Sequence, residues 1–104
     1  MNDGELIKRI NSSDDLWLIE FGSEFCIPCM QAADIVKEII AERAGISLIE
    51  VNIGERPALA ASFGVMSIPV ILLIRGGKEL GRVSGDISRA KVVAMIEANA
   101  SAKG

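Results

Sequence analysis

The chain has 104 residues, of which 50% are hydrophobic and 24% are charged, and its formal net charge is −3. This length and composition predict a single domain, residues 1–104, with a modest apolar core. No basic patch is present, which argues against a nucleic-acid partner. The longest apolar stretch, residues 65–74, is shorter than the roughly 20 residues that span a bilayer, so no membrane partner is expected. The acidic, polar N-terminus is unlike a secretory signal, and a cytoplasmic protein is expected.

Helix and strand patterns alternate through the first half of the chain. Apolar residues at helical spacing predict the helices, and a short apolar run bounded by Gly22 predicts a buried strand. Gly45 is expected to end the second helix. In order, the expected elements are a helix over residues 3–10, a polar turn at 11–15, a strand over 17–21, a helix over 30–44 and a strand over 47–52.

The second half adds a hairpin between two further helices. Arg75-Gly76-Gly77-Lys78 lies between two strand-like runs, which is typical of a tight hairpin turn. The expected elements are a short helix over 57–63, strands over 70–74 and 79–84, and a helix over 88–100. Strands joined through a helix form a parallel pair, and the hairpin adds antiparallel strands. We therefore expect an α/β fold with a mixed central sheet of about four strands, flanked by helices on both faces.

The motif Cys26-Ile27-Pro28-Cys29 contains the only cysteines of the chain and separates the first strand from the second helix. Two thiols at the start of a helix lie close enough to form a disulfide, and the positive end of the helix dipole favours thiolate over thiol. Pro28 suits a first helical turn, where its missing N–H is not needed. The pattern predicts a dithiol redox centre. Buried core cysteines or a static disulfide are the alternative.

A CxxC pair can also form half of a zinc site. Such a site needs about four ligands from cysteine, histidine or carboxylate groups. The chain has no histidine and no second cysteine pair, so an intrachain structural zinc is not expected and no bound cofactor is expected. The alternative left open is a metal ion or iron–sulfur cluster shared between two chains.

Glu20 is an acid inside an otherwise apolar strand. Burial of a carboxylate is costly unless the group is neutral or functional. Desolvation is therefore expected to raise the pKa of Glu20 toward the range that is useful for acid–base catalysis. The alternative is an edge position from which the carboxylate reaches water.

The stretch from Glu20 to Cys29, Glu-Phe-Gly-Ser-Glu-Phe-Cys-Ile-Pro-Cys, is similar to the acid–aromatic–CGPC stretch of the thioredoxin family. Ser67-Ile68-Pro69 matches the family's residue pair ending in a cis-proline. The hairpin turn and the later Gly85 match the family's turn and the glycine beyond it. In the order and spacing of these landmarks the chain resembles a thioredoxin. The resemblance implies a thioredoxin-like fold, and because little chain precedes Glu20, the family's first strand is expected to be missing.

Several positions depart from the family pattern. Phe25 replaces a tryptophan, Ile27 replaces the glycine between the cysteines, and Gly22 stands where tryptophan or another aromatic residue is common. Glu20 takes the place of a buried aspartate, and Glu50 falls where many members carry a lysine. If Glu50 lies beside Glu20, its charge is expected to raise the pKa of Glu20 further and to couple the two titrations.

The resemblance implies a role for each site residue. Cys26 is expected to be the attacking thiol, Cys29 the resolving thiol, and Glu20 the group that transfers a proton to and from Cys29. A cis bond before Pro69 would hold the backbone ready to pair with an extended substrate peptide. Exposed apolar residues around a reactive group indicate a docking surface, although Met66 packed in the core is an equal alternative. The expected substrate-binding residues are Phe25, Ile27, Pro28, Met66, Ile68, Pro69 and Gly85.

The function that follows is reduction of protein disulfides by a small dithiol–disulfide oxidoreductase. The resemblance implies disulfide-containing target proteins, a flavin-containing thioredoxin reductase as electron source, and a monomer. The alternative is a redox-responsive binding module of thioredoxin fold with little turnover. A glutaredoxin-like protein is a third interpretation, and the Ile27-Pro28 pair argues against it.

Overall fold

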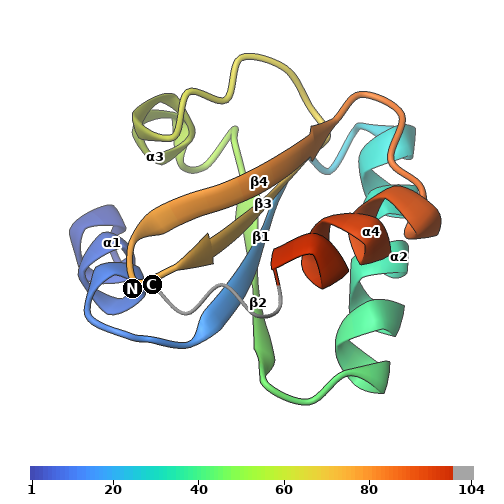
Figure 1. Cartoon of the computed structure of the whole chain (residues 1–104). Helices are drawn as coiled ribbons and strands as arrows, with labels where there is room; N and C mark the ends of the chain where they lie inside the picture. Colours follow the sequence, from blue (N-terminus) through green and yellow to red (C-terminus); the bar gives the residue numbers. More distant parts are fainter. Residues whose placement is uncertain (100–104) are drawn as a thin grey trace.

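The computed structural model describes residues 1–99 and has a four-stranded sheet between two layers of helices (Figure 1). The predicted order of helices and strands is confirmed throughout. The predicted last helix extends to Ala100, which lies outside the described residues. The elements are α1 (Asp3–Asn11), β1 (Leu16–Gly22), α2 (Ile27–Glu42), β2 (Ile46–Asn52), α3 (Pro57–Ser62), β3 (Val70–Arg75), β4 (Lys78–Ser84) and α4 (Arg89–Asn99).

The sheet is mixed, with the strand order β2-β1-β3-β4. β1 pairs in parallel with β2, to which α2 connects it, and antiparallel with β3. β3 and β4 form the predicted hairpin, in which Gly76 and Gly77 have φ angles of 60° and 77°. Two consecutive residues with positive φ are typical of the tight turn whose twist matches that of the strands. β1 is therefore an inner strand, hydrogen-bonded on both sides.

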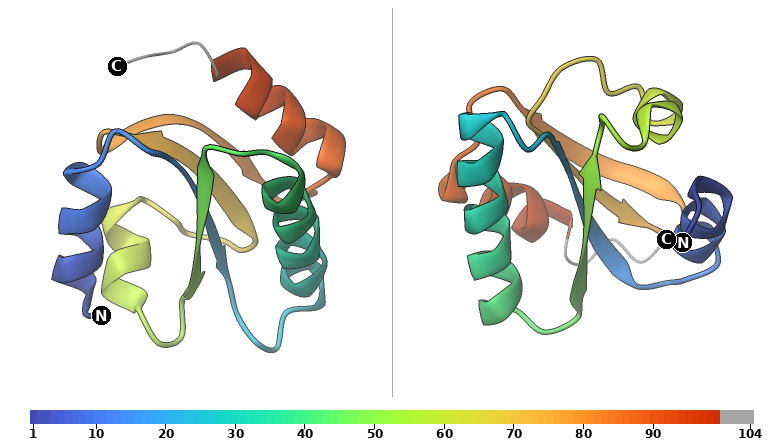
Figure 2. Two further views of the ribbon diagram at one scale, coloured as in Figure 1. Left: turned by 90° about the horizontal axis from the view of Figure 1, so that it is seen from below. Right: turned by 180° about the vertical axis from the view of Figure 1, so that it is seen from behind.

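Helices lie on both faces of the sheet (Figure 2), and each face has its own core. Side chains alternate along a strand, so Trp17, Ile19 and Phe21 pack on one face with residues of α1 and α3. Leu16 and Leu18 lie on the opposite face, against α2 and α4. By the same alternation Glu20 lies on the α2 face. The mixed sheet with helices on both faces is thus the predicted α/β architecture.

The helix termini show which local sequences begin and end these elements. The Asn2 side chain accepts the N–H of Glu5, and the Glu5 carboxylate accepts the N–H of Asn2, so a capping box begins α1. α2 begins at Ile27 and ends at Glu42, whereas the sequence pattern predicts residues 30–44. The earlier start places Pro28 and Cys29 in the first turn of α2. It follows that the cysteine motif is part of the helix.

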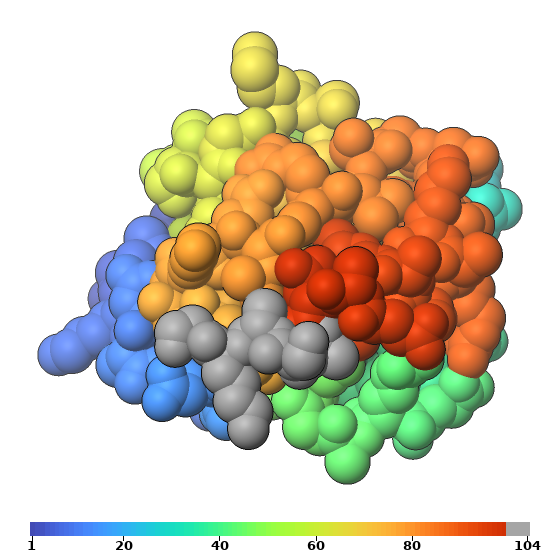
Figure 3. All heavy atoms as spheres, in the orientation of Figure 1, coloured from blue at the N-terminus to red at the C-terminus, as the bar shows by residue number. Residues whose placement is uncertain are grey.

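The segment between α3 and β3 forms a projection at the top of the molecule in the space-filling view (Figure 3). Arg82 of β4 ties the start of this segment to the sheet, because its guanidinium donates to the carbonyl oxygen of Phe63 at 2.8 Å. Within residues 1–99 no helix is both long and apolar enough to cross a membrane.

Candidate active site

The site is built around a disulfide between Cys26 and Cys29, whose Cα atoms are 5.2 Å apart. Cys26 is the N-cap residue of α2, and its Sγ accepts the backbone N–H of Cys29 at 3.2 Å. The two cysteines differ in exposure, since Cys26 is half-buried and Cys29 is only 3% exposed. One cysteine of the pair is therefore partly accessible from solution, while the other lies inside the fold.

Glu20 lies behind the disulfide and is only 5% exposed. Its strand is an inner strand, so the alternative of an edge position is wrong. Glu20 is in register with Glu50 of β2, and in a parallel pair these side chains share a face. Oε2 of Glu20 is buried and has no hydrogen-bond partner within residues 1–99. A buried carboxylate without a donor is much more stable when it is protonated.

The surroundings of Glu20 raise its pKa to about 7. Burial is the largest cause and the charge of Glu50 is the second, in the expected direction for both, while the coupling of the two titrations stays a prediction. Lys37 of α2 acts in the opposite direction and lowers the pKa. Its Nζ lies 3.6 Å from Oε1 of Glu50, so its charge is shared between the two carboxylates.

Lys37 was missed in the sequence, although its spacing contains a usable indication. Positions 29, 33 and 37 follow one another at intervals of four residues, so they lie along one face of a helix. Cys29 and Ala33 both face the space beside Glu20. A charged residue one turn further along this face is thus expected to reach the end of β2.

Gly22 lies between the buried acid and the buried sulfur. A Cβ at this position would lie 2.6 Å from Oε2 of Glu20, 2.9 Å from Cβ of Cys29 and 3.3 Å from its Sγ. Glu20 and Cys29 therefore approach each other closely enough for a proton to pass through one water molecule. The absence of a side chain at Gly22 leaves room for this close approach.

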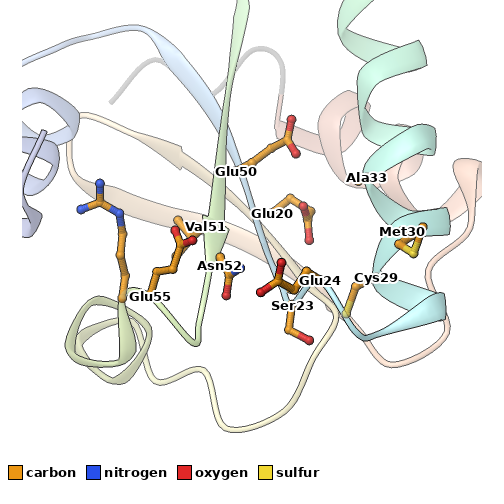
Figure 4. Close-up of a pocket in the computed structure, with 12 residues that line it drawn as sticks. Glu20, Ser23, Glu24, Cys29, Met30, Ala33, Glu50, Val51, Asn52 and Glu55 are labelled. Carbon is orange, nitrogen blue, oxygen red and sulfur yellow. The ribbon is translucent and has the colours of Figure 1, made fainter.

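A cavity of 390 Å³ opens beside these groups (Figure 4). Figure 4 shows Glu20, Glu24 and Cys29 on the side of β1 and α2, with Val51 and Glu55 on the side of β2. Four of the residues that line the cavity are acidic, namely Glu20, Glu24, Glu50 and Glu55. Glu20 and Glu50 were expected at the site from the sequence, whereas Glu24 and Glu55 were missed. We call this cavity the acidic cleft.

Apolar side chains lie exposed on and near the cysteine motif. Phe25 is 92% exposed and Ile27 is 69% exposed. Met66, on the segment before β3, is 98% exposed, so the alternative that it packs in the core is wrong. Met30, which was not expected at the site, is also exposed. Ile68 differs from these residues because it is half-buried and packs against the core on the α1 and α3 face.

The segment before β3 has the features that the resemblance implied. The peptide bond between Ile68 and Pro69 is cis. The N–H of Gly85 donates to the carbonyl oxygen of Pro69 at 3.3 Å, which joins two of the predicted binding residues. Gly85 has a φ angle of 76°, a conformation that favours glycine. Pro28 is exposed in the first turn of α2, beside the disulfide.

A half-exposed cysteine at a helix N-terminus, joined to a buried cysteine with an acid behind it, defines a dithiol–disulfide oxidoreductase. The family profile described as Thioredoxin matches residues 1–98. The chain therefore belongs to the thioredoxin family, whose members reduce protein disulfides by thiol–disulfide exchange.

Individual relatives agree with this family. The chain is 36% identical over 81 residues to a thioredoxin of Chlamydia caviae, covering 78% of this chain and 79% of the relative. It is 29% identical over 98 residues to thioredoxin 1 of a Nostoc species, covering 93% and 92%. Among solved structures, a mutant thioredoxin from Halobacterium salinarum has a TM-score of 0.81 at 24% identity, covering 94% of this chain and 85% of that one. This last likeness concerns the fold.

Proposed function

We propose that the protein reduces target disulfides with Cys26 as the attacking thiol and Cys29 as the resolving thiol. The observation that carries this assignment is the difference in exposure between the two cysteines, because only Cys26 is accessible to a target. In the reduced protein, the N–H of Cys29 and the positive end of the α2 dipole would stabilise a thiolate at Cys26.

The reaction consists of two exchanges. The Cys26 thiolate attacks one sulfur of the target disulfide, the target S–S bond breaks, and the released target thiolate takes up a proton. The Cys29 thiol then loses its proton, and its sulfur attacks Cys26 to release the second target thiol. The target has gained two electrons, and the protein holds the Cys26–Cys29 disulfide. A two-electron donor must reduce this disulfide before the next cycle.

We assign to Glu20 the role of accepting and returning the proton of Cys29. Its position beneath Gly22 supports this role, because Oε2 and Sγ of Cys29 both lie within 3.3 Å of where a Gly22 Cβ would be. A pKa of about 7 allows the carboxyl group both to accept and to return a proton near neutral pH. The acid is thus suited to the resolving step.

Target proteins would dock on the exposed apolar residues, which are Phe25, Ile27 and Met66, while Ile68 and Pro69 pair with the backbone of the target. Pro28 and Gly85 complete this binding surface. We further propose that a flavin-containing thioredoxin reductase supplies the electrons. The protein would then act as a monomer in the cytoplasm, in electron transport and cell redox homeostasis.

The experiment that tests this proposal measures the reduction of insulin disulfides with dithiothreitol as the reductant. We expect wild type to accelerate reduction and Cys26→Ser to lower the rate more than about 1000-fold. Cys29→Ser is expected to accumulate a mixed disulfide with the target. If wild type shows no rate above background, the protein is a redox-responsive binding module and the proposal is wrong. If Cys26→Ser traps the target instead, the two thiol roles are reversed.

A further inference from the structure

The acidic cleft adjoins the disulfide on its buried side and contains an unsatisfied carboxylate. Glu20, 5% exposed, lines the cleft, and its Oε2 has no hydrogen-bond partner within the described residues. Cys29 and Gly22 line the same cleft. A donor that entered from solution would meet a buried oxygen beside Sγ of Cys29. A ligand that donates hydrogen bonds would satisfy this oxygen.

The charges around the cleft indicate the sign of that ligand. The exposed carboxylates of Glu24 and Glu55 form no ion pair or hydrogen bond with the part of the chain that the structure describes. Arg56 also lines the cleft, but its guanidinium is bound to Asp3 at 2.8 Å, toward α1. Lys37 pairs with Glu50. An excess of negative charge therefore remains in the cleft, and it favours a cation.

The size and position of the cleft restrict the cation further. It lies directly beside Gly22, and its volume is 390 Å³. A guanidinium group is planar, carries five N–H donors and binds carboxylates through two parallel hydrogen bonds. An arginine side chain thus matches the carboxylates that line the cleft.

We propose that the acidic cleft is a specificity pocket for an arginine side chain of the target protein, located near the target's disulfide. This inference rests on the proposed function, because the arginine is brought to the cleft by a target whose cysteine reacts with Cys26. Glu24 and Glu55 bind the guanidinium at the entrance, and Glu20 supplies the inner acceptor. A cation at this place also stabilises the ionised form of Glu20, which accepts the proton of Cys29. Target docking and the resolving step are coupled in this way.

The test uses short synthetic peptides, each closed by one disulfide, in which a single residue is arginine or its neutral isostere citrulline. The residue is moved through the positions one to four residues from the reactive cysteine. We measure kcat/KM with dithiothreitol as the reductant. At one or more positions we expect arginine to exceed citrulline by about tenfold, the effect of a charge-assisted hydrogen bond. This ratio falls as salt is added.

Variants of the cleft assign this preference to its residues. We expect Glu24→Gln and Glu55→Gln each to lower the ratio of arginine to citrulline severalfold. Glu38→Gln is the matched control, because Glu38 is an exposed acid of α2 that does not line the cleft. This control is expected to keep the wild-type ratio.

The outcomes separate this inference from the proposed function. A ratio near one at every position, with the citrulline peptides still reduced, overturns the arginine pocket and leaves the reductase proposal intact. A ratio that falls equally in Glu38→Gln and Glu55→Gln reports net charge and also overturns the pocket. If no peptide and no insulin is reduced, the proposed function fails and the pocket fails with it.

Discussion

The two sides of the Cys26–Cys29 disulfide have opposite chemistry. On the outer side, Phe25 and Met66 expose 92% and 98% of their area to solvent. On the inner side, Glu20 is 5% exposed and lies among other carboxylates in the acidic cleft. Apolar side chains are exposed on one side and an acid is buried on the other, which reverses the usual distribution in a folded protein. Both sides therefore depart from what stability alone would select.

We expect the two sides to serve different steps of one reaction. Exposed apolar area is available to a target chain, which gains free energy by covering it. A buried acid with a raised pKa is available to exchange protons with a buried thiol. Changes on the inner side should therefore alter the chemical step and its pH dependence, and changes on the outer side should alter target affinity.

Among the changes on either side of the disulfide, Glu20→Gln is expected to have the largest effect on activity. This change removes the proposed proton acceptor of the resolving step and should lower kcat about 100-fold, within the range for general acid–base catalysis. In wild type the rate should rise with pH through about 7, as Glu20 loses its proton. We expect that rise to be absent in the variant. If the rate of Glu20→Gln still rises through this pH, another group titrates.

The same substitution should reveal the cost of burying the acid. Glu20 has a pKa of about 7 in the folded protein, against an ordinary value of 4.5. At pH values between 4.5 and about 7, Glu20 retains a proton in the folded protein that it has lost in the unfolded chain. The free energy of unfolding of wild type should therefore fall by about 3 kcal/mol as pH rises through this window. Urea unfolding of the oxidised protein at pH 5 and pH 8 measures it. Glu20→Gln should lack this decrease, and an equal decrease in both proteins would contradict the assignment.

A smaller effect is expected on the outer side. Phe25→Ser and Met66→Ser each remove apolar contact area and should raise KM for insulin about fivefold, or about 1 kcal/mol, with kcat retained. Ala41→Ser is the control, an exposed position in the last turn of α2, at the opposite end of the helix from the disulfide. A loss in kcat rather than in KM would mean that the apolar side takes part in the chemical step.

The smallest effect is expected from the charges around Glu20. Glu50→Lys replaces a neighbouring negative charge by a positive one and should lower the pKa of Glu20, so the rise in rate moves to lower pH. Lys37→Gln removes a cation and should move the rise to higher pH by a fraction of a pH unit. The measurement is the pH dependence of insulin reduction. If both variants keep the pH profile of wild type, neither charge acts on Glu20.

Much of the fold follows from local patterns in the sequence. Apolar periodicity predicts the order of helices and strands, and Gly76-Gly77 predicts the hairpin, because both depend on residues close together in the chain. The placement of Cys26 and Cys29 beside a helix start is local in the same sense. The predicted start of α2 is wrong, because the cysteine motif itself forms the first turn.

The cysteine pair, the α/β order and an acid within a buried strand are all evident from the amino-acid sequence. What surrounds that acid depends on how the elements pack. Lys37 and Glu50 meet because α2 packs beside β2, and Gly22 matters because Glu20 and Cys29 converge on it from different elements. Glu24 and Glu55 share a cleft although they are distant in the chain. The physical reason is that local patterns set each element's type and buried face, whereas packing between elements sets which side chains meet.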